Sequence, residues 1–145
     1  MEHRPDHLQH PDGRQFTDIA METLIRIGGV YNIALIVFHL SFWRIFNWNE
    51  ELGRVSFLNR AVMQVLNISL MFAFAIFAYI SLVHTGELLN SPLGNSLLVL
   101  MALFWLARSV QQVVFFKLKH WLSWLFLLLF MTGFLLYAIP AAALI

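Results

Sequence analysis

The sequence contains no cysteine among its 145 residues, and only 12% of the residues are charged. The absence of cysteine excludes disulfide bonds, thiol catalysis and iron–sulfur clusters. The formal net charge is only +1, and no basic stripe is interleaved with aromatic residues, so we expect no nucleic-acid partner. A G-x-S-x-G motif, which would indicate a hydrolase nucleophile, is also missing.

Hydrophobic residues are abundant by contrast. They make up 60% of the chain, and the mean hydropathy is +0.74. A soluble domain of this length could not bury so much apolar surface, so this composition predicts a single domain embedded in a membrane.

Four apolar runs are long enough to cross a bilayer, which takes about 20 helical residues. They cover residues 29–48, 57–83, 93–116 and 121–140. Each run is too long for a transmembrane strand, and the short connections make neighbouring helices antiparallel. The sequence therefore predicts an all-α fold, an antiparallel bundle of four transmembrane helices over residues 29–145.

The segment before the first span has two parts. Residues 1–15 contain two prolines and few apolar residues, which predicts a disordered polar tail. Residues 16–28 place Asp18, Glu22 and Arg26 on one helical face, which predicts a short amphipathic interfacial helix that ends near Gly28 and Gly29. The first 28 residues lack a cleavable signal pattern, so we expect the first span to direct its own insertion.

Lysine and arginine are distributed unequally between the two sides. The loops after the first and third spans carry Arg44, Arg54, Arg60, Lys117 and Lys119, whereas residues 84–95 and the C-terminus carry none. The positive-inside rule then places the basic loops in the cytoplasm and both termini outside. Arg4, Arg14 and Arg26 oppose this assignment.

Polar residues recur at one depth of the predicted bundle. Arg60, Gln64 and Asn67 are four and three residues apart, so they share a helical face. Counted at 1.5 Å per residue from the cytoplasmic ends of the spans, Gln64 and His39 lie about 10 Å deep and Arg108 about 12 Å deep. This layer predicts a pocket between the first three spans, with the fourth span closing the bundle from outside. The candidate ligand-binding residues are His39, Gln64, Asn67, Arg108, Gln112, Arg60, Asn32, Trp43 and Trp105.

Structural roles compete with ligand binding at several of these positions. Arg60 lies near a span end and can extend its guanidinium to the headgroups, while Gln112 and His39 can serve as hydrogen-bonded packing residues. Arg108 is harder to explain, because no acidic residue lies inside a span. Its partner is then Glu50 or Glu51 folding back, a set of neutral acceptors, or an anionic ligand.

The layer favours some cofactors over others. A quinone headgroup could accept hydrogen bonds from His39, Gln64 and Arg108, and a lipid headgroup is the other candidate. Haem is disfavoured, because His120 lies too shallow and His84 lies on the opposite side. A metal site is not predicted, since His3, His7 and His10 occupy a tail without a held geometry. We predict no catalytic residue, although His39 is the one candidate general base.

Two functions therefore stay open. The first is a small membrane protein that binds a lipid-like or quinone-like ligand with an anionic or carbonyl head. The alternative is a non-catalytic accessory or assembly subunit of a larger membrane complex, and the sequence also leaves a homo-oligomer open. The outward faces carry mostly Leu, Phe and Ala, in contact with membrane lipids, which favours the first function.

Three segments resemble a group of small bacterial four-helix integral membrane proteins whose activity is uncharacterised. They are "VFHLSFWRIFNW", "NRAVMQVLNISLMF" and "LFWLARSVQQVVFF", with an Asn-Arg-x-x-Met-Gln-x-x-Asn run and a Phe-Trp-x-x-Arg run. The resemblance covers residues 29–140. It implies a bacterial inner membrane and a polar layer that is common to the group, and it transfers no activity.

Overall fold

A computed structural model describes residues 12–144, and over this range the chain is helical with no strand. Four long helices form the bundle: α1 (Asp12–Leu40), α4 (Phe57–Val83), α6 (Pro92–Phe116) and α7 (Trp121–Ala142). Short helices connect them: α2 (Phe42–Ile45), α3 (Trp48–Glu51), η1 (Leu52–Arg54), α5 (Thr85–Asn90) and η2 (Lys117–Lys119). The predicted all-α four-helix bundle is confirmed, and each long helix has the length and apolar composition of a membrane span.

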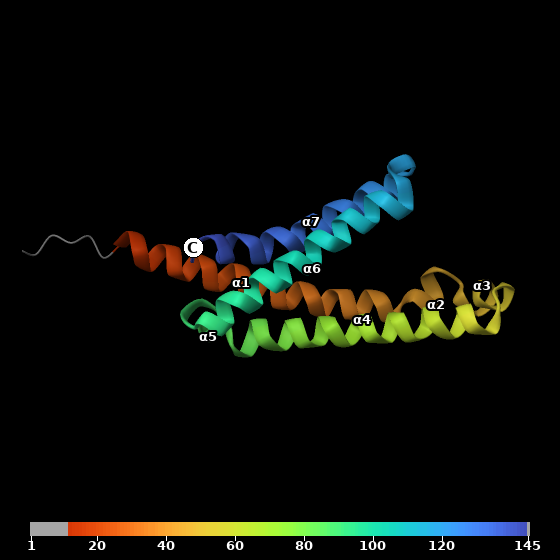
Figure 1. Ribbon diagram of the computed structural model, residues 1–145, viewed down its shortest axis with the longest axis horizontal. Helices are drawn as coiled ribbons and strands as arrows, with labels where there is room; N and C mark the ends of the chain where they lie inside the picture. The colour runs from red at the N-terminus through yellow and green to blue at the C-terminus, as the bar shows by residue number, and fades with distance from the viewer. Residues whose placement is uncertain (1–11, 145) are drawn as a thin grey trace, which may run out of the picture.

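The bundle consists of two arms that meet at one end. The first arm pairs α1 with α4 and includes α2, α3 and η1, while the second arm is the hairpin of α6 and α7. The arms pack together through α1 and α7 near α5, and they diverge toward the end that carries η2 and α3 (Figure 1). The bundle is therefore closed at the α5 end and open at the other.

Trp105 of α6 lies at the centre of the core where the arms meet. Its ring is parallel to that of Phe74 on α4, with centroids 5.5 Å apart, and it meets Tyr31 of α1 edge-on at 5.3 Å. On α7, a Cβ at Gly133 would lie 2.6 Å from the Trp105 ring. The glycine therefore permits the close approach of α6 and α7, and one indole of α6 contacts the three other long helices.

Serine caps determine where α4 and α6 begin. Ser56 Oγ accepts a hydrogen bond from the backbone N–H of Asn59 (3.4 Å), and Ser91 Oγ accepts one from Gly94 (2.9 Å). Pro92 at the first position of α6 has no N–H to satisfy and suits a helix start. α4 accordingly has the bounds of the predicted second span, and α6 and α7 differ from the predicted third and fourth spans by one or two residues.

The N-terminal predictions need correction. Residues 12–15 are helical rather than disordered, and α1 continues through residues 16–28 without the predicted end at Gly28 and Gly29. These glycines serve close packing: a Cβ at Gly28 would lie 2.8 Å from Tyr137, and one at Gly29 would lie 2.6 Å from Leu82. The rest of the predicted tail, with His3, His7 and His10, lies outside the described residues.

The first span also ends earlier than predicted, at Leu40 instead of residue 48. Apolar residues continue beyond this point, but Ser41 interrupts the helix and Asn47 adopts a left-handed conformation with φ of 46°. A side-chain amide can stabilise this conformation locally, which is why asparagine tolerates it. Trp48 is consequently turned back into the protein, where it is buried.

Candidate functional site

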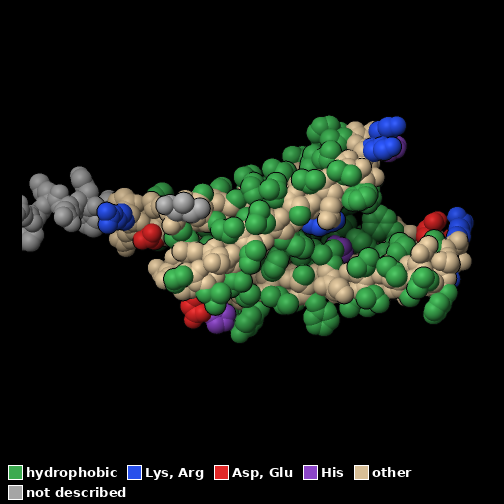
Figure 2. All heavy atoms as spheres, viewed as in Figure 1, with side chains coloured by type: hydrophobic (Ala, Val, Ile, Leu, Met, Phe, Trp, Pro, Cys, Tyr) green, Lys and Arg blue, Asp and Glu red, His purple; other side chains and the backbone are tan. Residues whose placement is uncertain are grey.

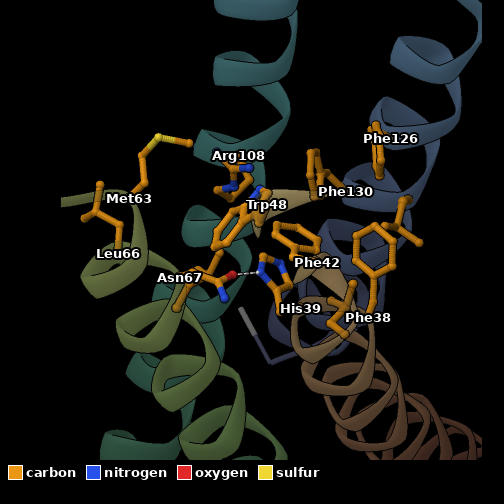
Figure 3. Close-up of a pocket in the computed structure, with 13 residues that line it drawn as sticks. Phe38, His39, Phe42, Trp48, Met63, Leu66, Asn67, Arg108, Phe126 and Phe130 are labelled. Carbon is orange, nitrogen blue, oxygen red and sulfur yellow. Dashed lines mark hydrogen bonds between the residues drawn. The ribbon is translucent and has the colours of Figure 1, made fainter. Parts of the chain in front are cut away.

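A cleft opens between the two arms on the side away from α5. It encloses a cavity of about 310 Å³, and basic and histidine side chains are visible inside the hollow (Figure 2). The first arm contributes Phe38, His39, Phe42, Trp48 and Asn67 to its lining, and the second contributes Arg108, Phe126 and Phe130 (Figure 3). The cleft thus combines three polar side chains with several aromatic rings.

His39 and Asn67 form a hydrogen-bonded pair on the first arm. His39 Nδ1 donates to Asn67 Oδ1 over 2.8 Å, and the imidazole stacks on Phe42 with centroids 4.4 Å apart (Figure 3). Because Nδ1 carries the proton in this pair, the other ring nitrogen of neutral His39 is an acceptor. The Asn67 amide retains its N–H groups as donors. The pair therefore offers an acceptor and donors side by side.

Arg108 faces this pair from the second arm. Its Nη1 donates to Gln111 Oε1 over 2.6 Å, and its Cζ lies 4.8 Å from the centre of the Phe130 ring. Among residues 12–144 no carboxylate forms an ion pair with Arg108, and Glu51 pairs instead with Arg54 at 3.5 Å. The guanidinium carries five N–H donors, so donors remain for a further acceptor.

The structure thus brings His39, Asn67 and Arg108 of the predicted set together. Depth explains why His39 meets Asn67 rather than Gln64. Because α1 ends at Leu40, His39 lies one residue from the end of its helix and not about 10 Å from it, as predicted. Asn67, ten residues into α4, lies about 15 Å from the start of that helix, close to the depth of about 12 Å for Arg108. Gln64 is half-buried and does not line the cleft.

Three more of the predicted residues make contacts near the ends of the helices. Arg60 Nε donates to the carbonyl of Leu52 over 2.8 Å, which ties η1 to α4. Gln112 is buried and its Nε2 donates to the carbonyl of Ser123 over 3.4 Å, linking α6 to α7. Trp43 is exposed and contacts Trp48 edge-on at 5.5 Å. None of the three lines the cleft.

Asn32 and Trp105, also predicted as ligand-binding, lie in the core. Asn32 Nδ2 donates to Gly28 O (2.7 Å) and Tyr137 Oη (2.8 Å), and Tyr137 Oη also shares a hydrogen bond of 2.9 Å with Ser81. This network joins α1, α4 and α7 at the closed end. Asn32 therefore connects helices through hydrogen bonds, as polar residues in membrane helices often do.

The aromatic lining of the cleft was not predicted, and the fourth span was wrongly expected to close the bundle from outside. α7 contributes Phe126 and Phe130 to the cavity. Phe38 and Phe42, like Phe126 and Phe130, are four residues apart in the sequence, a spacing that predicts a shared helical face. This repeated spacing is the signal that sequence reasoning missed, because α7 is apolar on every side.

Comparison with known protein families, with curated proteins and with solved structures finds nothing that matches this chain. The fold and the candidate spans define a multi-pass helical membrane protein with a cleft between two arms. A function must therefore be inferred from the geometry of the cleft.

Proposed function

We propose that the protein binds an amphipathic, lipid-like or quinone-like ligand in the cleft, with the anionic or carbonyl head between Arg108 and the His39–Asn67 pair. The observation that carries the proposal is that polar side chains from opposite arms face one cavity whose other walls are aromatic and aliphatic. Arg108 also lacks a carboxylate partner among the described residues, although a charge at this depth is costly without partners.

The wide cleft supports a bound molecule rather than direct pairing of the arms. An intramembrane ionisable residue that lines a cavity is typical of a binding site. The exposed surface of the long helices is largely Leu, Val, Ile and Phe, which suits contact with lipid more than contact with a second subunit. This favours a ligand-binding protein over an accessory subunit.

The test is replacement of the cleft arginine. Arg108→Ala removes charge-assisted hydrogen bonds of about 1.5–3 kcal/mol, so we expect affinity for the head to fall about tenfold to a hundredfold. Native mass spectrometry of the detergent-purified protein, with extraction of bound lipids and small molecules, measures how much ligand each variant retains.

Gln64→Leu is the matched control, since Gln64 is also a polar residue of a spanning helix but does not line the cleft. Circular dichroism and gel filtration establish that both variants fold. Loss of a defined amphipathic ligand from Arg108→Ala alone supports the proposal. If wild type and both variants carry nothing and bind no added amphiphile, the accessory role replaces it.

We also propose that the protein lies in a bacterial inner membrane with the open end of the cleft toward the cytoplasm. Lys117 and Lys119 in η2, and Arg44, Arg54 and Arg60 on the first arm, lie around this end, which supports the assignment through the positive-inside rule. The α5 end would then face outward.

Single cysteines test this orientation, because the chain has no cysteine of its own. Gly53 and Gly86 suit the purpose, since each is exposed, a Cβ at either would meet nothing within 4 Å, and they lie at opposite ends of α4. In intact cells, a membrane-impermeant maleimide is expected to label Gly86→Cys at once and Gly53→Cys only after lysis. The reverse pattern would invert the proposed topology.

A further inference from the structure

A second cavity adjoins the cleft. It also measures about 310 Å³ and forms a groove between α1 and α7. Leu35, Phe38, Phe126 and Leu129 line both cavities, so among the described residues these side chains form their shared wall. Phe38 and Phe126, with ring centroids 6.0 Å apart, form the central part of this shared wall.

The groove differs from the cleft in having almost no polar lining. Tyr31 supplies its only hydroxyl, which donates to the carbonyl of Leu129 over 2.7 Å and is therefore already satisfied. Ala34 lies on the groove wall, exposed and without bulk. A second groove along α1 shares Tyr31 and Ala34 and leads away from the cleft past Ile27 and Val30 to Thr23 and Arg26. The groove therefore suits an unbranched hydrocarbon chain.

The chemistry of the cleft distinguishes between possible heads. A phosphate or carboxylate only accepts hydrogen bonds, whereas the cleft offers donors from Arg108 and Asn67 and an acceptor nitrogen on neutral His39. A head with a carbonyl or hydroxyl oxygen that accepts from Arg108, and a hydroxyl that donates to His39, matches both. In the oxidised form, a second carbonyl would accept from the Asn67 amide instead. The depth of about 12–15 Å below the helix ends also disfavours a hydrated phosphate, which is costly to bring into hydrocarbon.

The surrounding rings favour a flat head. Phe42 stacks on His39, and Phe126 and Phe130 are near-parallel, with an interplanar angle of 18°. Aromatic rings pack best against other flat rings in offset or edge-on contact. A planar head of the size of one ring therefore fits between the arms better than a flexible polar group.

We propose that the ligand is a quinone, in its oxidised or hydroxyl form, that carries one long apolar chain. Its ring lies between Arg108 and the His39–Asn67 pair. Its chain enters the groove across the wall formed by Phe38 and Phe126, whose rings are in contact at 6.0 Å and must part to admit it. This inference rests on the proposed function and adds to it the class of the head and the path of the chain.

The test compares two quinones that share one ring, a form without a side chain and a form with a decyl chain. Binding to the full-length protein in lipid nanodiscs is followed by quenching of tryptophan fluorescence, since Trp48 lines the cleft. Ala34→Phe fills the groove from an exposed position without altering the polar residues. Ala75→Phe, exposed on a separate groove between α1 and α4, is the matched control.

We expect Ala34→Phe to weaken binding of the long-chain quinone about tenfold, or 1.4 kcal/mol, and to leave the chainless quinone unaffected. Ala75→Phe should change neither affinity. Ratios between variants are compared for each quinone separately, so that partition of the chain into lipid cancels.

Other outcomes distinguish failure of the quinone assignment or of its chain path from failure of the proposed function. Equal binding of the long-chain quinone by wild type and Ala34→Phe overturns the chain path. Failure of both quinones, with binding of a fatty acid or anionic phospholipid that Arg108→Ala abolishes, overturns the quinone class but keeps the proposed function. If no amphiphile binds, the proposed function itself fails.

Discussion

Replacing Trp105 with alanine is expected to lower the free energy of unfolding by about 2–3 kcal/mol. This is less than the roughly 3–5 kcal/mol typical of soluble cores, because the helices of an unfolded membrane protein stay in lipid and their apolar side chains are not exposed to water. The lost term is van der Waals packing, which is large here because the indole is fully buried and contacts Tyr31, Phe74 and Phe130. Part of the cost is offset, since Trp105 Nε1 is buried without a hydrogen-bond partner among the described residues.

The effect is measured by titration with sodium dodecyl sulfate, followed by circular dichroism so that the loss of an indole does not affect the signal. Trp121→Ala is the matched control, because Trp121 is 73% exposed at the start of α7. We expect this control to stay within about 0.5 kcal/mol of wild type. If Trp105→Ala keeps full stability but loses the co-purifying ligand, Trp105 contacts ligand, as the sequence analysis predicted.

The long helices were predictable because composition and length determine membrane spans with few alternatives. The extent of α1 was harder to predict. Gly28 and Gly29 usually weaken a helix, but here they permit contact with Tyr137 and Leu82, and only the tertiary structure reveals this. The end at Leu40 was hidden in the same way, because the aromatic residues that follow extend the apolar run without extending the helix.

The candidate site was only partly predictable for a related reason. Polar residues in an apolar helix are conspicuous, so His39, Asn67 and Arg108 were recognisable as candidates. Which residue faces which depends on helix rotation and on the angle between the arms. Gln64 and Asn67 share a predicted face, yet only Asn67 lines the cleft. Phe126 and Phe130 could not be distinguished from the lipid-facing residues of α7 by composition.

Gly94→Ala is expected to destabilise the protein by about 1–3 kcal/mol, the usual cost of overpacking. We expect a value in the upper part of that range, because the added methyl group would meet backbone atoms that cannot easily move. A Cβ at this position would overlap the backbone of Glu87 and Leu88, not a flexible side chain. The Glu87 carbonyl is also held in place, because it accepts hydrogen bonds from Ser91 N (3.1 Å) and Ser91 Oγ (2.8 Å). The turn between α5 and α6 must therefore open, and the same detergent titration measures the loss.

Gly86→Ala provides a control of opposite sign within the same helix–turn–helix segment. Gly86 lies in α5, and a Cβ there would meet nothing within 4 Å, so alanine should stabilise the helix by about 0.5–1 kcal/mol. A stabilising Gly94→Ala would mean that α5 and α6 are not in close contact. Since α5 also packs against α1 and α4, that result would remove the closed end from which the two arms diverge, and the cleft between Arg108 and His39 would lose its structural basis.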